Sequence, residues 1–219
     1  QNFDLGDVGY QQTEFFIEGT ASAFTNVSEL GSDGFWVLEP AEQAAYKTRI
    51  VVYSPVDPAD FNGIVLMEWL NVTAGFETPP SWGTGQLEMR RGGSVWVGVS
   101  AQLIGIEGSD RGLLPLHLKA VDAARYGSLS HPGDAHSYDI FSQVAQAIRR
   151  PGDIDPLGEL TAEYLIAYGE SQSAGRLVTY VNGLQPLYGT FDGYMIHSRG
   201  GSASPISQEP MTSISAPAA

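Results

Sequence analysis

The chain contains no cysteine, so disulfide bonds and thiolate metal sites are both excluded. It also has no apolar run that approaches the roughly 20 residues a membrane-spanning helix requires. Basic residues are scarce, with 11 Lys and Arg against 25 Asp and Glu, and the formal net charge is −14. A surface of that sign repels nucleic acid and anionic membranes, so neither is expected as a partner, although the charge would serve solubility equally well.

What is present is ordinary for a globular domain. The chain has 219 residues, of which 42% are hydrophobic, and this is enough for one full core. No cofactor is expected, and no carboxylate stands at ligand spacing from the loop histidines to suggest a metal. The sequence begins at Gln1 without a basic, apolar leader, so we expect a mature secreted or periplasmic protein.

Short β-branched and aromatic runs alternate with segments of helical periodicity. The expected strands cover residues 13–20, 35–38, 48–54, 64–70, 94–100, 165–168 and 191–197, and the expected helices cover 81–91, about 137–150 and 173–184. Ser137 is placed to cap the second helix, and Pro151 stops it. Residues 103–136 lack clear periodicity and are predicted to form a surface excursion, with His131 and His136 in loop positions.

From residue 64 onwards, strands and helices alternate, which is typical of a parallel sheet with right-handed crossovers. The predicted fold class is therefore α/β, with a mostly parallel sheet and flanking helices. Ligands of such sheets bind beyond the carboxyl ends of the strands. Ser171, the loop at Asn71, Gln102 and His197 are all expected to project at that edge.

The most informative stretch is Gly169-Glu-Ser-Gln-Ser173, which follows an apolar strand and opens a helix. Hydrolases place a nucleophilic serine on such a strand-to-helix corner, usually in the pattern G-x-S-x-G. Here the fifth position is Ser173, which is still small enough for a close crossing. Ser171 is either that nucleophile or a small structural residue in a βα turn.

Four segments together resemble the α/β-hydrolases, and more narrowly a bacterial and fungal α/β-hydrolase-domain family marked by a Gly-Glu-Ser-Gln-Ser elbow. They are Glu68-Trp-Leu-Asn-Val72, Ser137-Tyr-Asp-Ile-Phe-Ser-Gln143, the elbow itself, and His197-Ser-Arg-Gly200. The resemblance extends over about residues 13–201. It implies an α/β-hydrolase fold and a serine hydrolase that acts on carboxylic esters or a related acyl bond.

The same resemblance implies roles for individual residues. Ser171 would form the acyl-enzyme, and the main-chain N–H of Gln172 would be one oxyanion donor. A second donor would come from the loop at Asn71 and Val72. No cofactor takes part in such a reaction, and the partner is a small ester.

Four further residues are candidates for substrate binding, and each also has a plain structural interpretation. They are Glu170, Trp82, Phe76 and Arg199. Glu170 flanks the serine, and Arg199 could meet an anionic group or pair with an acid. Trp82 and Phe76 could line an acyl pocket or belong to the core. His197 is the sole histidine after Ser171, so it is a candidate for the base or for a pocket residue.

The triad in this fold runs Ser, acid, His along the chain, on loops after later strands. The 48 residues after Ser171 hold one helix, one strand and a polar tail, so the acid and the histidine are expected in a companion segment outside this chain. We therefore expect residues 1–219 to be one domain, incomplete at its C-terminus. It would comprise N-terminal strands and loops (1–47), a parallel βα core (48–201) and a tail (202–219).

Two alternatives belong to other functional classes. A hydrolase-like chain without a base could be an inactive binding or assembly subunit. A nucleotide-binding doubly wound domain would share the parallel sheet. However, no G-x-G-x-x-G or G-x-x-x-x-G-K-[ST] pattern follows any expected strand, so the sequence contains no phosphate-binding loop of that kind.

Overall fold

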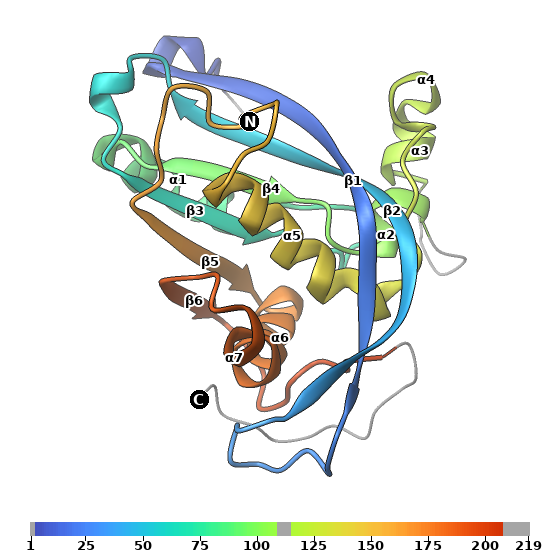
Figure 1. The fold of residues 1–219 in the computed structure, drawn as a ribbon. Helices are drawn as coiled ribbons and strands as arrows, with labels where there is room; N and C mark the ends of the chain where they lie inside the picture. The colour runs from blue at the N-terminus through green and yellow to red at the C-terminus, as the bar shows by residue number, and fades with distance from the viewer. Residues whose placement is uncertain (1–2, 109–114, 208–219) are drawn as a thin grey trace.

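The structure is a computed structural model that describes residues 3–108 and 115–207. These residues form a six-stranded mixed sheet with the strand order β1-β2-β4-β3-β5-β6 (Figure 1). The strands are β1 (Tyr10–Asn26), β2 (Leu38–Pro55), β3 (Ile64–Trp69), β4 (Val95–Val99), β5 (Tyr164–Glu170) and β6 (Gly193–His197). The pairs β1–β2 and β2–β4 are antiparallel, whereas β4, β3, β5 and β6 run parallel. The predicted α/β class with a mostly parallel sheet is confirmed.

Helices connect the parallel strands. They are α1 (Pro80–Gly92), α2 (Leu103–Glu107), α3 (Leu118–Val121), α4 (Ala123–Tyr126), α5 (Ser137–Arg149), α6 (Gln172–Thr179) and α7 (Gln185–Tyr188). Short 3-10 turns lie at Gly6–Val8, Pro58–Asp60 and Asp134–His136, and a π-helical turn at Tyr180–Leu184 joins α6 to α7. Within the described ranges, no helix has the length and apolar character needed to cross a membrane.

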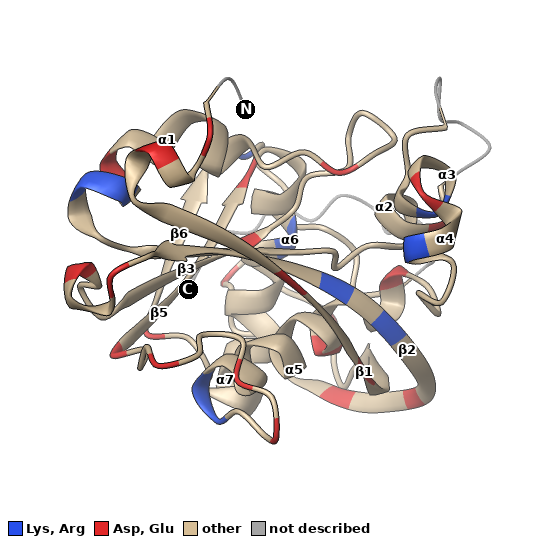
Figure 2. Ribbon diagram, turned by 90° about the horizontal axis from the view of Figure 1, so that it is seen from above, with Lys and Arg blue, Asp and Glu red and all other residues tan. Residues whose placement is uncertain are grey.

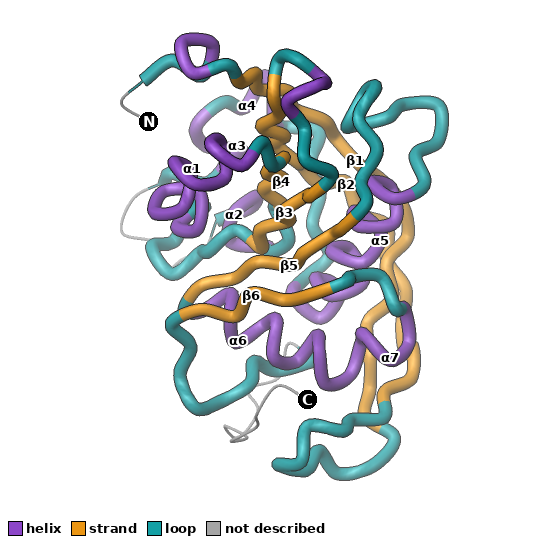
Figure 3. The backbone as a smooth tube through the Cα atoms, turned by 90° about the vertical axis from the view of Figure 1, so that its left-hand side faces the viewer, coloured by secondary structure: helices purple, strands orange, loops and turns teal. Residues whose placement is uncertain are grey.

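The sheet is covered on both faces, which explains why β3 and β4 are almost continuously apolar. Phe141 and Val144 of α5 and Leu177 of α6 pack with strand residues in the main core cluster. On the other face, Trp82 and Met89 of α1 join a second cluster. Figure 3 shows α1 and α5 on opposite sides of the strands. Acidic residues are spread over many elements rather than gathered on one face (Figure 2).

The N-terminal hairpin is longer than predicted. β1 has 17 residues and β2 has 18, and they pair along nearly their whole length with one irregularity between Ser22 and Phe24. The outer half of the hairpin packs against α5, and the Ser22 N–H donates a hydrogen bond to Asp139 Oδ2 there, at 2.6 Å. The strand predicted at 35–38 is wrong, since β2 only begins at Leu38. Residues 39–45 of β2 are mostly exposed and pair with β1 by backbone hydrogen bonds, so the hydrophobic pattern misses this part of the hairpin.

Residues 103–136 are only in part the predicted surface excursion: most of residues 115–128 are exposed, but the two ends of the segment are buried. The described part contains α2, α3 and α4, and Leu129, His131 and His136 are buried. The segment lies against the β1–β2 hairpin, where Lys47 and Ser130 exchange backbone hydrogen bonds. Short helices of four or five residues leave little periodicity, which is why the sequence pattern misses them.

Two predicted helix ends also differ. Ser137 is the first residue of α5 and makes no capping bond to it; the N-cap position is His136. The helix predicted over 173–184 continues through the π turn to Tyr188. In the predicted tail, the described part packs on the domain: Ile206 is buried, and the Thr179 hydroxyl donates to the Ser204 carbonyl at 2.5 Å. Residues 208–219 of that tail lie outside the described residues.

Glu68, at the end of β3, caps the first turn of α1 from inside the protein. The side chain is fully buried and accepts from the N–H groups of Ser81 (2.9 Å) and Trp82 (3.1 Å). It also accepts from Trp96 Nε1 at 2.8 Å. Burial raises the pKa of Glu68, and these three donors partly offset that rise. The carboxylate thus fixes where α1 begins relative to the sheet.

We expect Glu68→Gln to lower the free energy of unfolding by about 1–3 kcal/mol, because the new amide N–H₂ would face buried donors and leave them unsatisfied. A urea titration followed by circular dichroism measures this as a lower midpoint with an unchanged slope. Glu88→Gln, on the exposed side of the same helix, is the control and should stay within about 0.5 kcal/mol of the wild type. Equal midpoints for Glu68→Gln and the wild type would contradict the capping role.

Candidate active site

The turn between β5 and α6 holds Ser171 in an unusual backbone conformation. Ser171 has φ 56° and ψ −111°, and Ser198 is the one other non-glycine residue with positive φ in the described ranges. Such conformations cost roughly 1–3 kcal/mol, so the neighbours must hold them in place. The Ser171 N–H donates to the His197 carbonyl on β6 (3.0 Å), and the Ser171 carbonyl accepts from the Gly175 N–H in α6 (3.2 Å). The turn leaves Ser171 exposed.

Small residues allow strand and helix to meet at this turn. A Cβ at Gly169 would lie only 2.9 Å from the carbonyl oxygen of Ser173, so a larger residue would push α6 away from β5. Ser173 is fully buried, and its hydroxyl donates to the Glu170 carbonyl at 2.9 Å and accepts from the Glu170 N–H at 3.1 Å. Serine fits at the fifth position of the motif because its hydroxyl is satisfied inside the turn.

The loop after β3 is tied to this turn by Asn71. Its backbone N–H and carbonyl exchange hydrogen bonds with Thr78, at 3.0 and 2.8 Å. Its side-chain Nδ2 donates to the Glu170 carbonyl at 2.9 Å. The Asn71 N–H is therefore already engaged, and the next N–H along the loop, that of Val72, points to Gln172, whose Oε1 lies 3.4 Å away.

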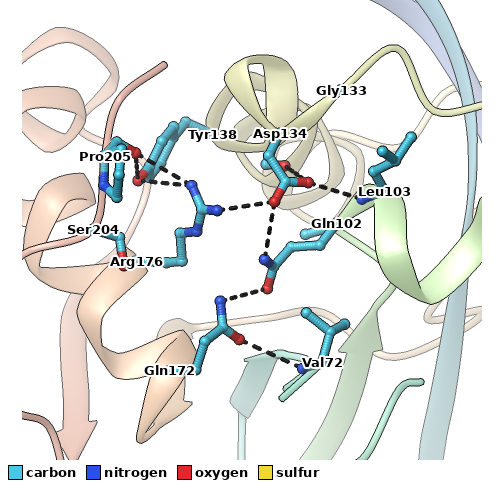
Figure 4. Close-up of polar contacts among 12 residues, drawn as sticks. Val72, Gln102, Leu103, Gly133, Asp134, Tyr138, Gln172, Arg176, Ser204 and Pro205 are labelled. Carbon is cyan, nitrogen blue, oxygen red and sulfur yellow. Dashed lines mark hydrogen bonds and ion pairs between the residues drawn. The ribbon is translucent and has the colours of Figure 1, made fainter. Parts of the chain in front are cut away.

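A chain of polar side chains runs from this N–H into the protein (Figure 4). Gln172 Nε2 donates to Gln102 Oε1 at 3.0 Å, and Gln102 Nε2 donates to Asp134 Oδ2 at 3.3 Å. Gln102 Oε1 also accepts from Trp69 Nε1 at 3.0 Å. Segments far apart in the sequence thus meet beside Ser171.

An open pocket of about 620 Å³ lies at the carboxyl ends of the parallel strands, where ligand sites of such sheets are found. Its lining consists of Val72, Thr73, Gln102, Ile104, Asp134, Ser171, Gln172, Arg176 and Gly200. The structure therefore brings together three predicted site residues, Ser171, Gln172 and Val72. Gln102, which the sequence places at the same edge, lines the pocket as well.

Asp134 and Arg176 line the pocket but were not among the predicted site residues. Arg176 Nη2 lies 2.9 Å from Asp134 Oδ2, and both side chains are mostly buried. Arg176 Nη1 also donates to the Pro205 carbonyl at 3.2 Å. A signal for Arg176 was present, because it is the sole charged residue in positions 171–190. Asp134 stands in an irregular segment without a comparable signal.

Glu170, His197 and Arg199 lie beside the turn rather than in the pocket lining. The sheet register pairs Glu170 with His197. His197 Nδ1 lies 3.7 Å from Glu170 Oε2 and 3.0 Å from the hydroxyl of Ser198. Arg199 Nη1 donates to the Gly200 carbonyl at 3.2 Å.

The two aromatic candidates are also outside the pocket lining. Trp82 is buried in the cluster under α1, with its ring 4.7 Å from Tyr53 and 5.5 Å from Trp96. Phe76 is half-buried in the loop between Asn71 and Thr78. Neither residue lines the pocket at Ser171.

No histidine is joined to the Ser171 hydroxyl by a hydrogen bond within residues 3–108 and 115–207. His131 is buried between the Ala101 carbonyl and the Gly133 N–H, and burial lowers its pKa. His136 is buried as well, and His117 Nδ1 lies 3.0 Å from the Ile106 carbonyl. Among the same residues, no three or more His, Asp or Glu side chains form a group that could hold a metal ion.

Comparisons with known proteins agree with this architecture. A family profile described as "Alpha/beta hydrolase domain" matches residues 1–218. Comparison with curated proteins finds no significant match.

Solved structures similar to this chain include an arylesterase, at 15% identity with a TM-score of 0.38 over 74% of this chain and 44% of that one. Another is acetyl xylan esterase 1 from Thermoanaerobacterium sp. JW/SL YS485, at 12% identity with a TM-score of 0.38 over 75% of this chain and 48% of that one. The matched region thus corresponds to less than half the length of each esterase.

Proposed function

Because this chain belongs to the α/β-hydrolase domain family, we propose that it is a serine hydrolase that cleaves carboxylic esters or a related acyl bond. The observation that carries the proposal is the position of Ser171. Its exposed side chain stands on a strained turn at the end of β5 and lines a pocket of about 620 Å³. A nucleophile elbow places its serine in this way, open to both substrate and base.

In the proposed reaction, Ser171 Oγ attacks the ester carbonyl carbon and its proton passes to an imidazole base. The C–O bond to the alcohol then breaks, and the alcohol leaves with that proton, so that an acyl-enzyme remains. A water molecule next gives a proton to the same base and attacks the acyl carbon. The acid is released, and the proton returns to Ser171 Oγ.

Two backbone N–H groups are suited to stabilise the oxyanion of this reaction. The Gln172 N–H lies in the first turn of α6, where helix N–H groups have no intrahelical partner. The Val72 N–H points to the same turn from the loop after β3. Each such donor is worth about 10²–10³ in turnover. Asn71 would support them by tying the loop to β5.

The base and its acid partner, we propose, come from a companion segment outside this chain. The proposal is supported by the environments of the histidines. His117, His131 and His197 make contacts away from the Ser171 hydroxyl, and His136 is buried with no hydrogen bond to either ring nitrogen among the described residues. The proposal is also supported by β6, which within the described residues pairs with β5 alone and leaves Met195 48% exposed. An open strand edge of this kind is a site for a further strand.

His197→Ala tests where the base lies. We expect fluorophosphonate to label Ser171 in this variant within about twofold of the wild-type rate, because His197 turns to Glu170 and Ser198. The rate is measured by intact mass spectrometry on the protein purified from its natural source. His197→Gln, which keeps a polar group at this position, is the control. A loss of 100-fold or more in the alanine variant would instead make His197 the base.

The proposal itself is tested by fluorophosphonate labelling of the wild type and of Ser171→Ala. The alternative is an inactive hydrolase-like binding or assembly subunit, which is favoured by one observation: no described histidine forms a hydrogen bond with the Ser171 hydroxyl. Wild-type protein of that kind would not be labelled by the fluorophosphonate.

A further inference from the structure

The side chain of Gln172 accepts a hydrogen bond from the Val72 N–H, which is one of the two oxyanion donors of the proposed reaction. Gln172 Oε1 accepts from the Val72 N–H at 3.4 Å, so the second oxyanion donor already has a partner in the free protein. The same residue would supply the first donor through its backbone N–H. One residue therefore both builds the oxyanion site and competes for it.

The orientation of this amide is fixed by its neighbours. Trp69 Nε1 can only donate, so the oxygen of Gln102 must face it. Gln102 Nε2 then faces the acceptor Asp134 Oδ2. Since Gln102 Oε1 also accepts from Gln172 Nε2, the oxygen of Gln172 is left to face the Val72 N–H. If either amide were rotated by 180°, its NH₂ group would face another donor and its oxygen would face another acceptor.

The chain of amides is buried, with short hydrogen bonds, at Trp69 and Gln102, and it is more exposed, with a longer hydrogen bond, at Gln172. Trp69 and Gln102 are buried, at 0% and 2% exposure, whereas Gln172 is half-buried at the pocket. The bonds to Gln102 Oε1 from Trp69 and Gln172 are both 3.0 Å, but the bond from the Val72 N–H to Gln172 Oε1 is 3.4 Å. Because hydrogen bonds weaken with length, the Val72 contact is the one that gives way first.

We propose that the Gln172 carboxamide is an internal competitor for the oxyanion site, which the substrate oxygen must displace from the Val72 N–H. The inference rests on the proposed serine hydrolase function. A neutral ester oxygen competes on roughly equal terms with a neutral amide oxygen. A negatively charged oxyanion forms bonds about twice as strong, so displacement of the carboxamide is completed as charge develops on the substrate oxygen, and breaking the Val72–Gln172 bond adds to the barrier. Gln102 is the positioning residue that holds the competitor in place.

Substitutions at residue 172 separate competition from a supporting role, with fluorophosphonate labelling of Ser171 as the readout. Gln172→Met keeps the length but not the acceptor, so labelling should accelerate roughly two- to tenfold, the factor that one neutral hydrogen bond is worth. Gln172→Glu puts a charged acceptor on the Val72 N–H, so labelling should slow by about tenfold or more. If both variants are slowed alike, the side chain supports the turn and the competition is overturned.

A second measurement follows the hydrogen bond without any reaction. Asn-Val occurs twice in the chain, at 26–27 and 71–72, so carbonyl-¹³C asparagine with ¹⁵N valine yields two correlated NMR signals. Val27 donates to the Val37 carbonyl and serves as the internal reference. In Gln172→Met, the Val72 amide proton should move upfield while Val27 stays. An unmoved Val72 signal would overturn the competition.

The labelling experiment tests the competitor and the proposed serine hydrolase function separately. Labelling that is independent of residue 172 overturns the competitor alone. A wild type and variants that all fail to label overturn the proposed function and the competitor with it.

Discussion

Ser171→Ala is expected to abolish covalent labelling by a fluorophosphonate and to lower ester hydrolysis roughly a millionfold, the scale seen when a serine nucleophile is removed. The reason is that the bond to the substrate forms at Ser171 Oγ, and an alanine methyl group cannot make it. Intact mass spectrometry should show one phosphonyl group on the wild type and none on the variant. The backbone strain at residue 171 is the same for both side chains, so the turn should persist.

Ser198→Ala is the matched control for this prediction. Ser198 is the other serine with positive φ, it is exposed, and it follows β6 just beside the site. Its loss should leave labelling unchanged. A phosphonyl group found on Ser198, or full hydrolysis by Ser171→Ala, would sink the assignment of the nucleophile. An unlabelled wild type would favour the inactive subunit.

The parallel half of the fold could be predicted because its signals are local. β3, β4 and β5 are short buried runs, and each is followed by turn residues and a helix. The strand-to-helix turn at Ser171 needs small residues within a few positions, and Gly169 and Ser173 supply them. Such features depend on neighbours in sequence, so a single sequence contains them.

The surroundings of Ser171 could not be predicted in the same way, because they depend on contacts between distant segments. The sequence places Gln102 at the same edge as Ser171, but it does not predict the bond from Gln102 to Gln172, 70 positions away. Nor does it predict the pair of Asp134 and Arg176, which are 42 positions apart. Trp82 is equally ambiguous in sequence, since an aromatic residue after a strand suits a pocket or a core. The Glu68 carboxylate accepts a hydrogen bond from the Trp82 N–H at the start of α1, and this holds Trp82 in the hydrophobic cluster under that helix.

The pair of Asp134 and Arg176 also joins several of the elements that line the pocket. Asp134 accepts from the Leu103 N–H at 2.9 Å and from Gln102 Nε2, so it fixes the start of α2 as well as the amide chain. Arg176 joins α6 to the segment at Pro205. One ion pair thus connects the elements on both sides of Ser171.

Asp134→Ala is therefore expected to lower the free energy of unfolding by about 3 kcal/mol, the low end of the cost of leaving a buried charge unpaired. The low end applies because the side chains of Arg176 and Asp134 retain 11% and 16% exposure. A urea titration measures the loss. Glu18→Ala, which breaks the exposed pair with Lys47, is the control and should cost no more than about 1 kcal/mol.

A double-mutant cycle decides whether the unpaired charge causes that loss. Arg176→Met removes the guanidinium and keeps an apolar side chain of similar length, so Asp134→Ala combined with Arg176→Met should be more stable than Asp134→Ala alone. The part not recovered reports the bonds from Leu103 and Gln102, which the second substitution does not restore. If the double variant is as unstable as the sum of the single ones, the charges are not coupled, and Asp134 stabilises the site only through the neutral donors of α2 and the amide chain.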